Sequence, residues 1–188
     1  KENYMDQSYL ENNSQFIIKK IKMLEGKSVL ACGMTGFLGR PFLDIFAFYF
    51  EKYRSSRVTL NILTTNPQYY VSIYPYMQMR FINSDLKKSE IPSIKCDLFI
   101  QGISIRNVEK HIGISKVARF EFITRVARLS AEFIKKNKPK RTFFFSSGAV
   151  YGAKTSEALG VNESSDLTLD LTGNEICYAG AKVYSELL

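Results

Sequence analysis

The stretch Val29-Leu-Ala-Cys-Gly-Met-Thr-Gly-Phe-Leu-Gly39 decides the fold. Its first four residues form a short apolar run that is typical of a buried strand, and residues 41–53 after it have the pattern of a helix. Three glycines spaced as GxxGxxG join the two elements. Because a glycine turn between a strand and a helix is where many α/β proteins bind the phosphates of a dinucleotide, we expect NAD or NADP here.

Each glycine of this turn has an expected role. Gly33 allows the tight turn after the strand, Gly36 lets the backbone approach a pyrophosphate, and Gly39 lets the helix pack closely. The N–H groups at the start of the helix then bind the phosphates. The alternative is a turn that is rich in glycine for packing only. The remaining turn residues that we expect at the cofactor are Thr35, Phe37 and Leu38.

The rest of the chain alternates short apolar runs with longer amphipathic segments. This alternation predicts an α/β fold, a doubly wound parallel sheet of the Rossmann type. We expect an N-terminal extension over residues 1–25, polar up to residue 14 and then a short helix capped by Ser14. Residues 26–188 would form the NAD(P)-binding domain, incomplete at its C-terminus. The expected strands are 29–32, 57–63, 79–82, 98–100 and 142–145, and further helices are expected over 115–136 and from 177.

Composition limits the classes of function. The chain of 188 residues is 45% hydrophobic, which suits one domain with a sizeable core, and no apolar run reaches the roughly 18 residues that span a membrane. Its three cysteines lie far apart, which favours a reducing compartment, so we expect a cytoplasmic protein without a cysteine metal site. The net charge of +8 suits anionic partners. Much of it lies in the run 135–141, which we interpret as a solvated helix end before the fifth strand, at the edge of the sheet opposite to the glycine turn. We therefore expect no nucleic-acid partner.

The ends of the second and third strands are the next candidates for cofactor contacts. An acid after the second strand favours NAD and a nearby arginine favours NADP, but the sequence there is Thr64-Thr65-Asn66, which leaves the choice open. Thr65 is our candidate at the ribose, and Asn66-Pro67 is expected to form a turn after this strand. Asp85 and Leu86, after the third strand, are placed to meet the adenine edge; the alternative for Asp85 is a helix cap.

Two motifs near the C-terminal end carry the chemistry. The fifth strand leads into Ser146-Ser147-Gly-Ala-Val-Tyr151, and Tyr178-Ala-Gly-Ala-Lys182 has the YxxxK spacing. Residues four apart share a face of a helix, and a lysine ammonium beside a phenol favours the phenolate. Such a tyrosine can take a proton from a substrate hydroxyl while a serine hydroxyl holds the developing oxyanion. The alternative for Tyr178 and Lys182 is an ordinary surface helix.

Taken together, residues 26–188 resemble the extended short-chain dehydrogenase/reductase family of nucleotide-sugar epimerases and dehydratases. The motifs GMTGFLG, DL, SSGAVYG and YAGAK occur in the family's order. The resemblance implies that Ser147, Tyr178 and Lys182 are catalytic and that Lys182 also holds the nicotinamide ribose. It implies further cofactor contacts from Gln101 and Gly102, and it implies a nucleotide-linked sugar as substrate, oxidised to a keto intermediate that is epimerised or reduced. A homodimer is left open.

Several positions depart from the family's pattern. The end of the fourth strand is Phe99-Ile-Gln-Gly102 instead of His-Leu-Ala-Ala, and Ile123-Thr124 replaces a usual asparagine. An Asp-Glu pair that follows the catalytic hydroxyl in family dehydratases is Gly148-Ala149 here, so we expect no 4,6-dehydratase, although Glu157 or Glu163 could supply an acid. Because the resemblance implies a substrate portion after Leu188, we expect a cofactor-binding fragment with little or no turnover. A regulator without turnover is the alternative function. The single histidine, His111, is expected to be solvated, and no metal site is expected.

Overall fold

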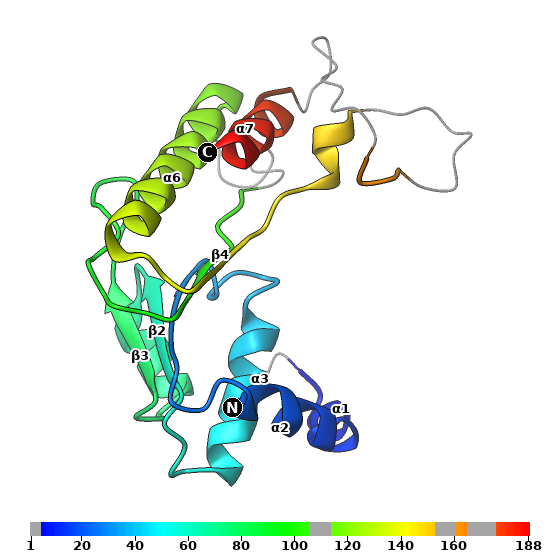
Figure 1. The fold of residues 1–188 in the computed structure, drawn as a ribbon, viewed down its shortest axis with the longest axis vertical. Coiled ribbons are helices and arrows are strands. Elements are labelled where there is room, and N and C mark those ends of the chain that lie inside the picture. The colour runs from blue at the N-terminus through cyan, green and yellow to red at the C-terminus, as the bar shows by residue number, and fades with distance from the viewer. Residues whose placement is uncertain (1–4, 106–113, 153–160, 165–175) are drawn as a thin grey trace. The chain divides into compact units, whose positions relative to one another are not determined.

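The computed structural model describes residues 5–105, 114–152, 161–164 and 176–188 (Figure 1). Its sheet has five parallel strands in the order β3-β2-β1-β4-β5. In this order β1 lies at the centre. The chain adds β2 and β3 on one side of it and then crosses to add β4 and β5 on the other side, as in the Rossmann fold. The predicted doubly wound α/β class is therefore confirmed. The strands are β1 (Ser28–Cys32), β2 (Thr59–Thr64), β3 (Met79–Asn83), β4 (Leu98–Gln101) and β5 (Arg141–Phe144).

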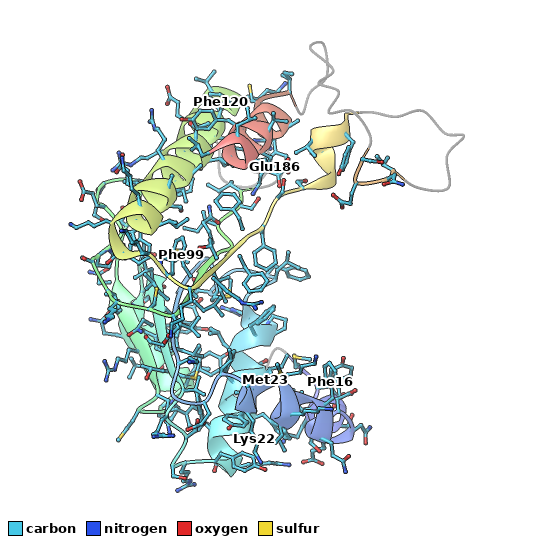
Figure 2. All side chains as sticks on the ribbon, viewed as in Figure 1. Phe16, Lys22, Met23, Phe99, Phe120 and Glu186 are labelled. Carbon is cyan, nitrogen blue, oxygen red and sulfur yellow. The ribbon has the colours of Figure 1, made fainter. Side chains whose placement is uncertain are left out.

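The two faces of the sheet are covered by different elements. On one face, Val29 and Ala31 of β1 pack in a core with Phe50 and other residues of α3 (Arg40–Lys52). On the other face, the buried ring of Phe99, labelled in Figure 2, lies 4.8 Å from that of Phe133 in α6 (Lys116–Asn137), measured between ring centroids. The alternation of buried side chains along a strand thus supplies both layers.

The N-terminal extension differs from its prediction. Residues 7–12, expected to be polar and frayed, form the helix α1 (Gln7–Asn12), whose N-cap Asp6 accepts a hydrogen bond from the N–H of Ser8. Leu10 is only 2% exposed and belongs to the same core as α3. The second helix, α2 (Ser14–Lys22), begins at Ser14, so Ser14 is not its cap. The burial of one leucine on a six-residue helix gives too short a pattern to be recognised in the sequence.

A further helix follows β2, where the sequence suggested only a turn at Asn66-Pro67. It is α4 (Pro67–Ile73), and the side-chain oxygen of Asn66 accepts a hydrogen bond from the N–H of Tyr69. Proline suits the first turn of a helix because that position needs no N–H donor. The asparagine cap and the buried Tyr70 then stabilise seven residues as a helix.

The chain divides into two compact units. The first contains residues 1–103 and 133–144, and the second contains residues 104–132 and 145–188. The second unit includes the 3-10 turn η1 (Gly148–Tyr151) and the helix α7 (Ile176–Leu187). Its apolar cluster is formed by Ile123, Tyr178 and Ala181, with Ala149 packed against it.

The basic run lies at the amino end of β5. Lys140 Nζ is 2.8 Å from Asp97 Oδ1, and this contact lowers the pKa of Asp97. Since the glycine turn follows the carboxyl end of β1 and the strands are parallel, the run is at the opposite edge of the sheet, as predicted.

Candidate functional site

The first glycine of the turn is held against the end of β4. Gly33 has φ +81°, and a Cβ there would lie 2.5 Å from the carbonyl carbon of Gly102 and 2.6 Å from its oxygen. The N–H of Gly102 donates to the carbonyl of Cys32 at 2.9 Å. Any other residue at position 33 would separate β1 from β4, so the tight turn expected of Gly33 is what the structure shows.

The other two glycines differ from each other. A Cβ on Gly39 would lie 2.5 Å from the carbonyl carbon and oxygen of Met34, so this glycine is required by the turn itself and not, as expected, by helix-to-sheet packing. A Cβ on Gly36 would meet only the oxygen of Gly33, at 3.3 Å. The protein's own atoms therefore explain Gly33 and Gly39 fully, but explain Gly36 poorly. A ligand that approaches the backbone is the remaining reason for a glycine at that position.

The two residues between the second and third glycines, Phe37 and Leu38, face outward. Phe37 is 75% exposed and Leu38 is 71% exposed, which is unusual for large apolar side chains. The carbonyl of Thr35 accepts a hydrogen bond from the hydroxyl of Tyr70 at 3.2 Å, which ties the turn to α4. The turn thus presents an open surface at the start of α3.

The residues after β2 and β3 were expected to contact the cofactor, with a capping role as the alternative for Asp85. Thr65 and Asn66 are exposed, and Asn66 is occupied as the cap of α4. Asp85 Oδ1 accepts a hydrogen bond from the N–H of Lys87 at 3.0 Å, which is a capping arrangement, although the segment is a turn and not a helix. Leu86 is buried. An adenine contact by Asp85 or Leu86 stays a prediction.

The end of β4 contains a buried polar group without a partner. Gln101 is 1% exposed, and its Oε1 accepts a hydrogen bond from the N–H of Ile103 at 2.7 Å. Among the residues that the structure describes, its buried Nε2 has no hydrogen-bond partner. An unsatisfied buried donor is costly, which suits a group that meets a ligand. Together with the open backbone at Gly36, this amide fits a dinucleotide near the carboxyl ends of β1 and β4.

Tyr178 and Lys182 of the second unit are both buried, which excludes the surface-helix alternative. Tyr178 is 5% exposed, and Lys182 is fully buried. The ammonium Nζ of Lys182 donates to the carbonyl of Phe145 at 2.7 Å and lies 6.0 Å from the centroid of the Tyr178 ring. Burial lowers the pKa of Lys182, while the neighbouring Tyr178 and Glu186 oppose this shift.

Two contacts of Tyr178 were not predicted. Its hydroxyl lies 3.0 Å from the hydroxyl of Ser104, a residue on the loop after β4. The guanidinium of Arg119 in α6 lies 5.2 Å from the centroid of its ring. Ser104 and Arg119 are 74 and 59 positions away in the sequence, and no local motif marks either of them.

Ser147 caps the 3-10 turn η1, and its role as an oxyanion holder stays a prediction. Its side chain is half-buried, and its Oγ accepts a hydrogen bond from the N–H of Ala149 at 3.3 Å as the cap of η1. In the described part of the second unit the structure brings Tyr178 to Ser104 and shows no hydrogen bond between Tyr178 and Ser147. The neighbouring Ser146 donates to the carboxylate of Glu186, which is labelled on α7 in Figure 2.

Ile123 and Thr124, which replace the asparagine of the family pattern in the long helix, take part in packing. Ile123 is 1% exposed within the apolar cluster that contains Tyr178, and the hydroxyl of Thr124 donates to the carbonyl of Phe120 in the same helix. Glu163 accepts a hydrogen bond from the hydroxyl of Tyr151. His111 and Glu157 lie outside the described residues.

The described residues contain neither a cluster of metal ligands nor a membrane-spanning helix. No group of three or more His, Cys, Asp or Glu side chains there could hold a metal ion. Within the same ranges, every helix is too short or too polar to cross a membrane.

Comparisons with known proteins identify the fold. No protein-family model matches the chain, and no curated protein matches its sequence. Several solved structures do match. The ADP-L-glycero-D-manno-heptose-6-epimerase of Helicobacter pylori has 18% identity and a TM-score of 0.57, over 87% of this chain and 50% of that one. A UDP-glucose 4-epimerase from Bifidobacterium longum, in complex with NAD+ and UDP, has 16% identity and a TM-score of 0.56, over 85% and 47%.

A third match is an NAD-dependent NDP-hexosamine 5,6-dehydratase involved in tunicamycin biosynthesis, with 18% identity and a TM-score of 0.60, over 86% and 48%. The chain has the fold of these enzymes. It spans about half the length of each of them. The Rossmann-like fold that the motif resemblance implied is thereby confirmed.

Proposed function

We propose that this chain is the NAD(P)-binding portion of an extended short-chain dehydrogenase/reductase that acts on a nucleotide-linked sugar. The observation that carries the proposal is the glycine turn. Gly33 and Gly39 are fixed by contacts within the protein, whereas Gly36 leaves its backbone open. The order of motifs and the fold shared with the sugar epimerases support the same assignment.

Most of the residues that would hold the cofactor belong to the first unit, and Lys182 of the second unit would hold the nicotinamide ribose. Backbone N–H groups of the turn would bind the pyrophosphate, and Asp85 and the unpartnered amide of Gln101 would add polar contacts. When bound, NAD or NADP would supply the acceptor for a hydride from the sugar carbon. A bound cofactor would satisfy this buried amide, which has no partner among the described residues.

The proton chemistry would belong to the second unit. Tyr178 would take the proton of the sugar hydroxyl, and the ammonium of Lys182 on the same helix would favour the resulting phenolate. Ser104 is in place to donate a hydrogen bond to that phenolate. Ser147 remains the proposed oxyanion donor, since it follows β5 and is only half-buried.

Epimerisation or keto reduction fits this set of residues better than 4,6-dehydration. Dehydration needs an acid for the leaving hydroxyl and a base for the C5 proton. The two positions after Ser147 are Gly148 and Ala149, and Ala149 packs against the apolar cluster of α6 and α7. Neither residue can transfer a proton.

A cofactor-binding portion without turnover is the second candidate. It is favoured by the arrangement of Ser147, whose Oγ caps η1 and has no described contact with Tyr178. An oxyanion donor that lies away from the base would leave the hydroxyl-to-carbonyl chemistry incomplete.

Calorimetric titration with NAD+ and NADP+ tests the proposal. Gly36→Ala adds one methyl group that would lie 3.3 Å from the carbonyl oxygen of Gly33, a tight contact that a small shift of the turn relieves, and that would face a bound pyrophosphate. The matched control is Gly180→Ala, where the new Cβ would meet only a ring carbon of Phe120 at 3.8 Å. We expect the parent and the control to bind and Gly36→Ala to bind at least about tenfold more weakly. Equal binding by all three folded proteins would contradict the proposal. Turnover of a nucleotide hexose that is lost in Tyr178→Phe would exclude the second candidate.

A further inference from the structure

The first turn of α3 presents an arginine to the helix that follows β2. Arg40 comes directly after Gly39, and its Nη2 donates to the hydroxyl of Tyr70 at 3.5 Å. Its guanidinium carbon lies 5.9 Å from the centroid of the Tyr70 ring. The same hydroxyl donates to the carbonyl of Thr35. Tyr70 therefore holds Arg40 between the glycine turn and α4.

In doubly wound folds, the adenosine ribose binds at this place, near the end of the second strand. In doubly wound dinucleotide sites an acid after the second strand accepts hydrogen bonds from the ribose 2′-hydroxyl, whereas an arginine nearby binds a 2′-phosphate. The segment from Thr64 to Tyr70 contains no acid. Thr65 and Asn66 are exposed and neutral, and Asn66 is engaged as the cap of α4. The sequence alone left the cofactor undecided because Arg40 is 24 residues before Thr64 and its position near α4 depends on the fold.

Resting on the proposed function, we propose that the first unit prefers NADP to NAD and that Arg40 binds the 2′-phosphate. A guanidinium offers several N–H donors in a rigid plane that matches the oxygens of a phosphate. Tyr70 holds the guanidinium plane of Arg40 by a hydrogen bond and by its ring. The arginine side chain therefore loses little conformational freedom when it binds a phosphate. The two solved structures cited above that name a cofactor name NAD, so the proposed preference would distinguish the present chain from them.

The charge of Arg40 is secure in this environment. Its hydrogen bond to Tyr70 is the largest of the causes that raise the pKa of Arg40 above its ordinary value. A dianionic phosphate would thus meet a permanent positive charge. The exposed ring of Tyr69 is in edge contact with Tyr70 at 5.1 Å between centroids, and Tyr69 also contributes to the raised pKa of Arg40.

The test is calorimetric titration of the 188-residue chain with NADP+ and NAD+ at low ionic strength, on the parent and three variants. We expect the parent to bind NADP+ about 10- to 100-fold more tightly than NAD+, the range of a charge-assisted bidentate contact. Arg40→Gln should remove this difference and leave NAD+ affinity within about twofold. Arg40→Lys should keep part of it, since it keeps the charge without the planar donors.

The matched control is Arg54→Gln on the same unit. The side chain of Arg54 is 82% exposed and pairs with Glu51 three residues before it, so its loss should leave both affinities unchanged. In the parent, equal affinities or tighter binding of NAD+ would overturn the NADP preference while leaving the proposed function intact. If a folded Arg40→Gln variant bound NADP+ and NAD+ more weakly by the same factor, the proposed role of Arg40 would be overturned. Binding of neither ligand by the parent would overturn the proposed function as well.

Discussion

The hydroxyl groups of Tyr178 and Ser104 lie 3.0 Å apart, although the two residues are 74 positions apart in the chain. Tyr178 is buried at its ring by Ile123 and Ala181, and the guanidinium of Arg119 lies over its face. Within the described structure, the side-chain hydroxyl of Tyr178 therefore has its hydrogen-bond partner on the loop after β4. The serine after β5 that the motif marks as catalytic, Ser147, has a different hydrogen bond.

A double-mutant cycle should reveal this pair. Ser104→Ala leaves a buried phenol hydroxyl unsatisfied, so we expect it to lower the free energy of unfolding by about 1–3 kcal/mol. In the Tyr178→Phe background the same change should cost much less. Urea denaturation of the parent, the two single variants and the double variant measures the coupling energy, which we expect at about 1 kcal/mol. Additive effects would mean that the two hydroxyls do not interact.

Two glycine-to-alanine changes should have opposite effects. Gly39→Ala forces a Cβ into the backbone of Met34, which cannot move without opening the turn, so we expect a loss of about 3 kcal/mol or more. Gly180→Ala lies inside α7 with only ordinary contact to Phe120, and should stabilise the protein by about 0.5–1 kcal/mol. Thermal and urea unfolding report both. A tolerated Gly39→Ala would show that the turn is looser than described.

The cysteines should differ in reactivity toward iodoacetamide. Burial raises the pKa of Cys32 to about 12, and burial also raises the pKa of Cys96. At pH 8 the thiolate of Cys32 would be about one molecule in ten thousand, and its sulfur is inaccessible. Cys177 is partly exposed and should be alkylated first. Mass spectrometry of tryptic peptides at successive times measures the order, and the denatured chain, in which all three should react, is the control. Early labelling of Cys32 would contradict its burial.

The fold was predictable because its signals are local and repeated. Each strand is a short apolar run, and the glycine turn sits between β1 and α3, so the class follows without knowledge of contacts. The helices α1 and α4 were not predicted because six or seven residues give no clear period, although the Asn66-Pro67 pair is a helix-start signal that we interpreted as a turn.

The candidate site was predictable only where one segment contains it. Tyr178 and Lys182 lie four residues apart on α7, and their spacing alone places both on one helix. Ser104 and Arg40 could not be found in this way. Their contacts join residues 74 and 30 positions apart, and only the packed structure brings the partners together.

The burial of Lys182 predicts a pH dependence of stability. Burial lowers its pKa in the folded protein, whereas in the unfolded chain it returns to the ordinary value near 10.5. Between these two values the unfolded chain holds a proton that the folded protein has released, so the free energy of unfolding contributed by this residue rises with pH. The cost of burying the charge is fully present below the folded pKa and disappears as the pH approaches 10.5. Lys182→Met removes this titration, together with the hydrogen bond to Phe145.

We therefore expect the stability difference between the parent and Lys182→Met to change in favour of the parent as the pH rises from 7 toward 10.5. Urea denaturation at intervals of pH measures it, and subtraction of the two curves cancels the groups that they share. Lys136→Met, which removes an exposed lysine of α6, is the control and should give a difference that is flat by comparison. A constant difference between the parent and Lys182→Met over this range would mean that the buried ammonium keeps its charge. In that case the hydrogen bond to Phe145 and the carboxylate of Glu186 would compensate fully for the loss of water around Lys182.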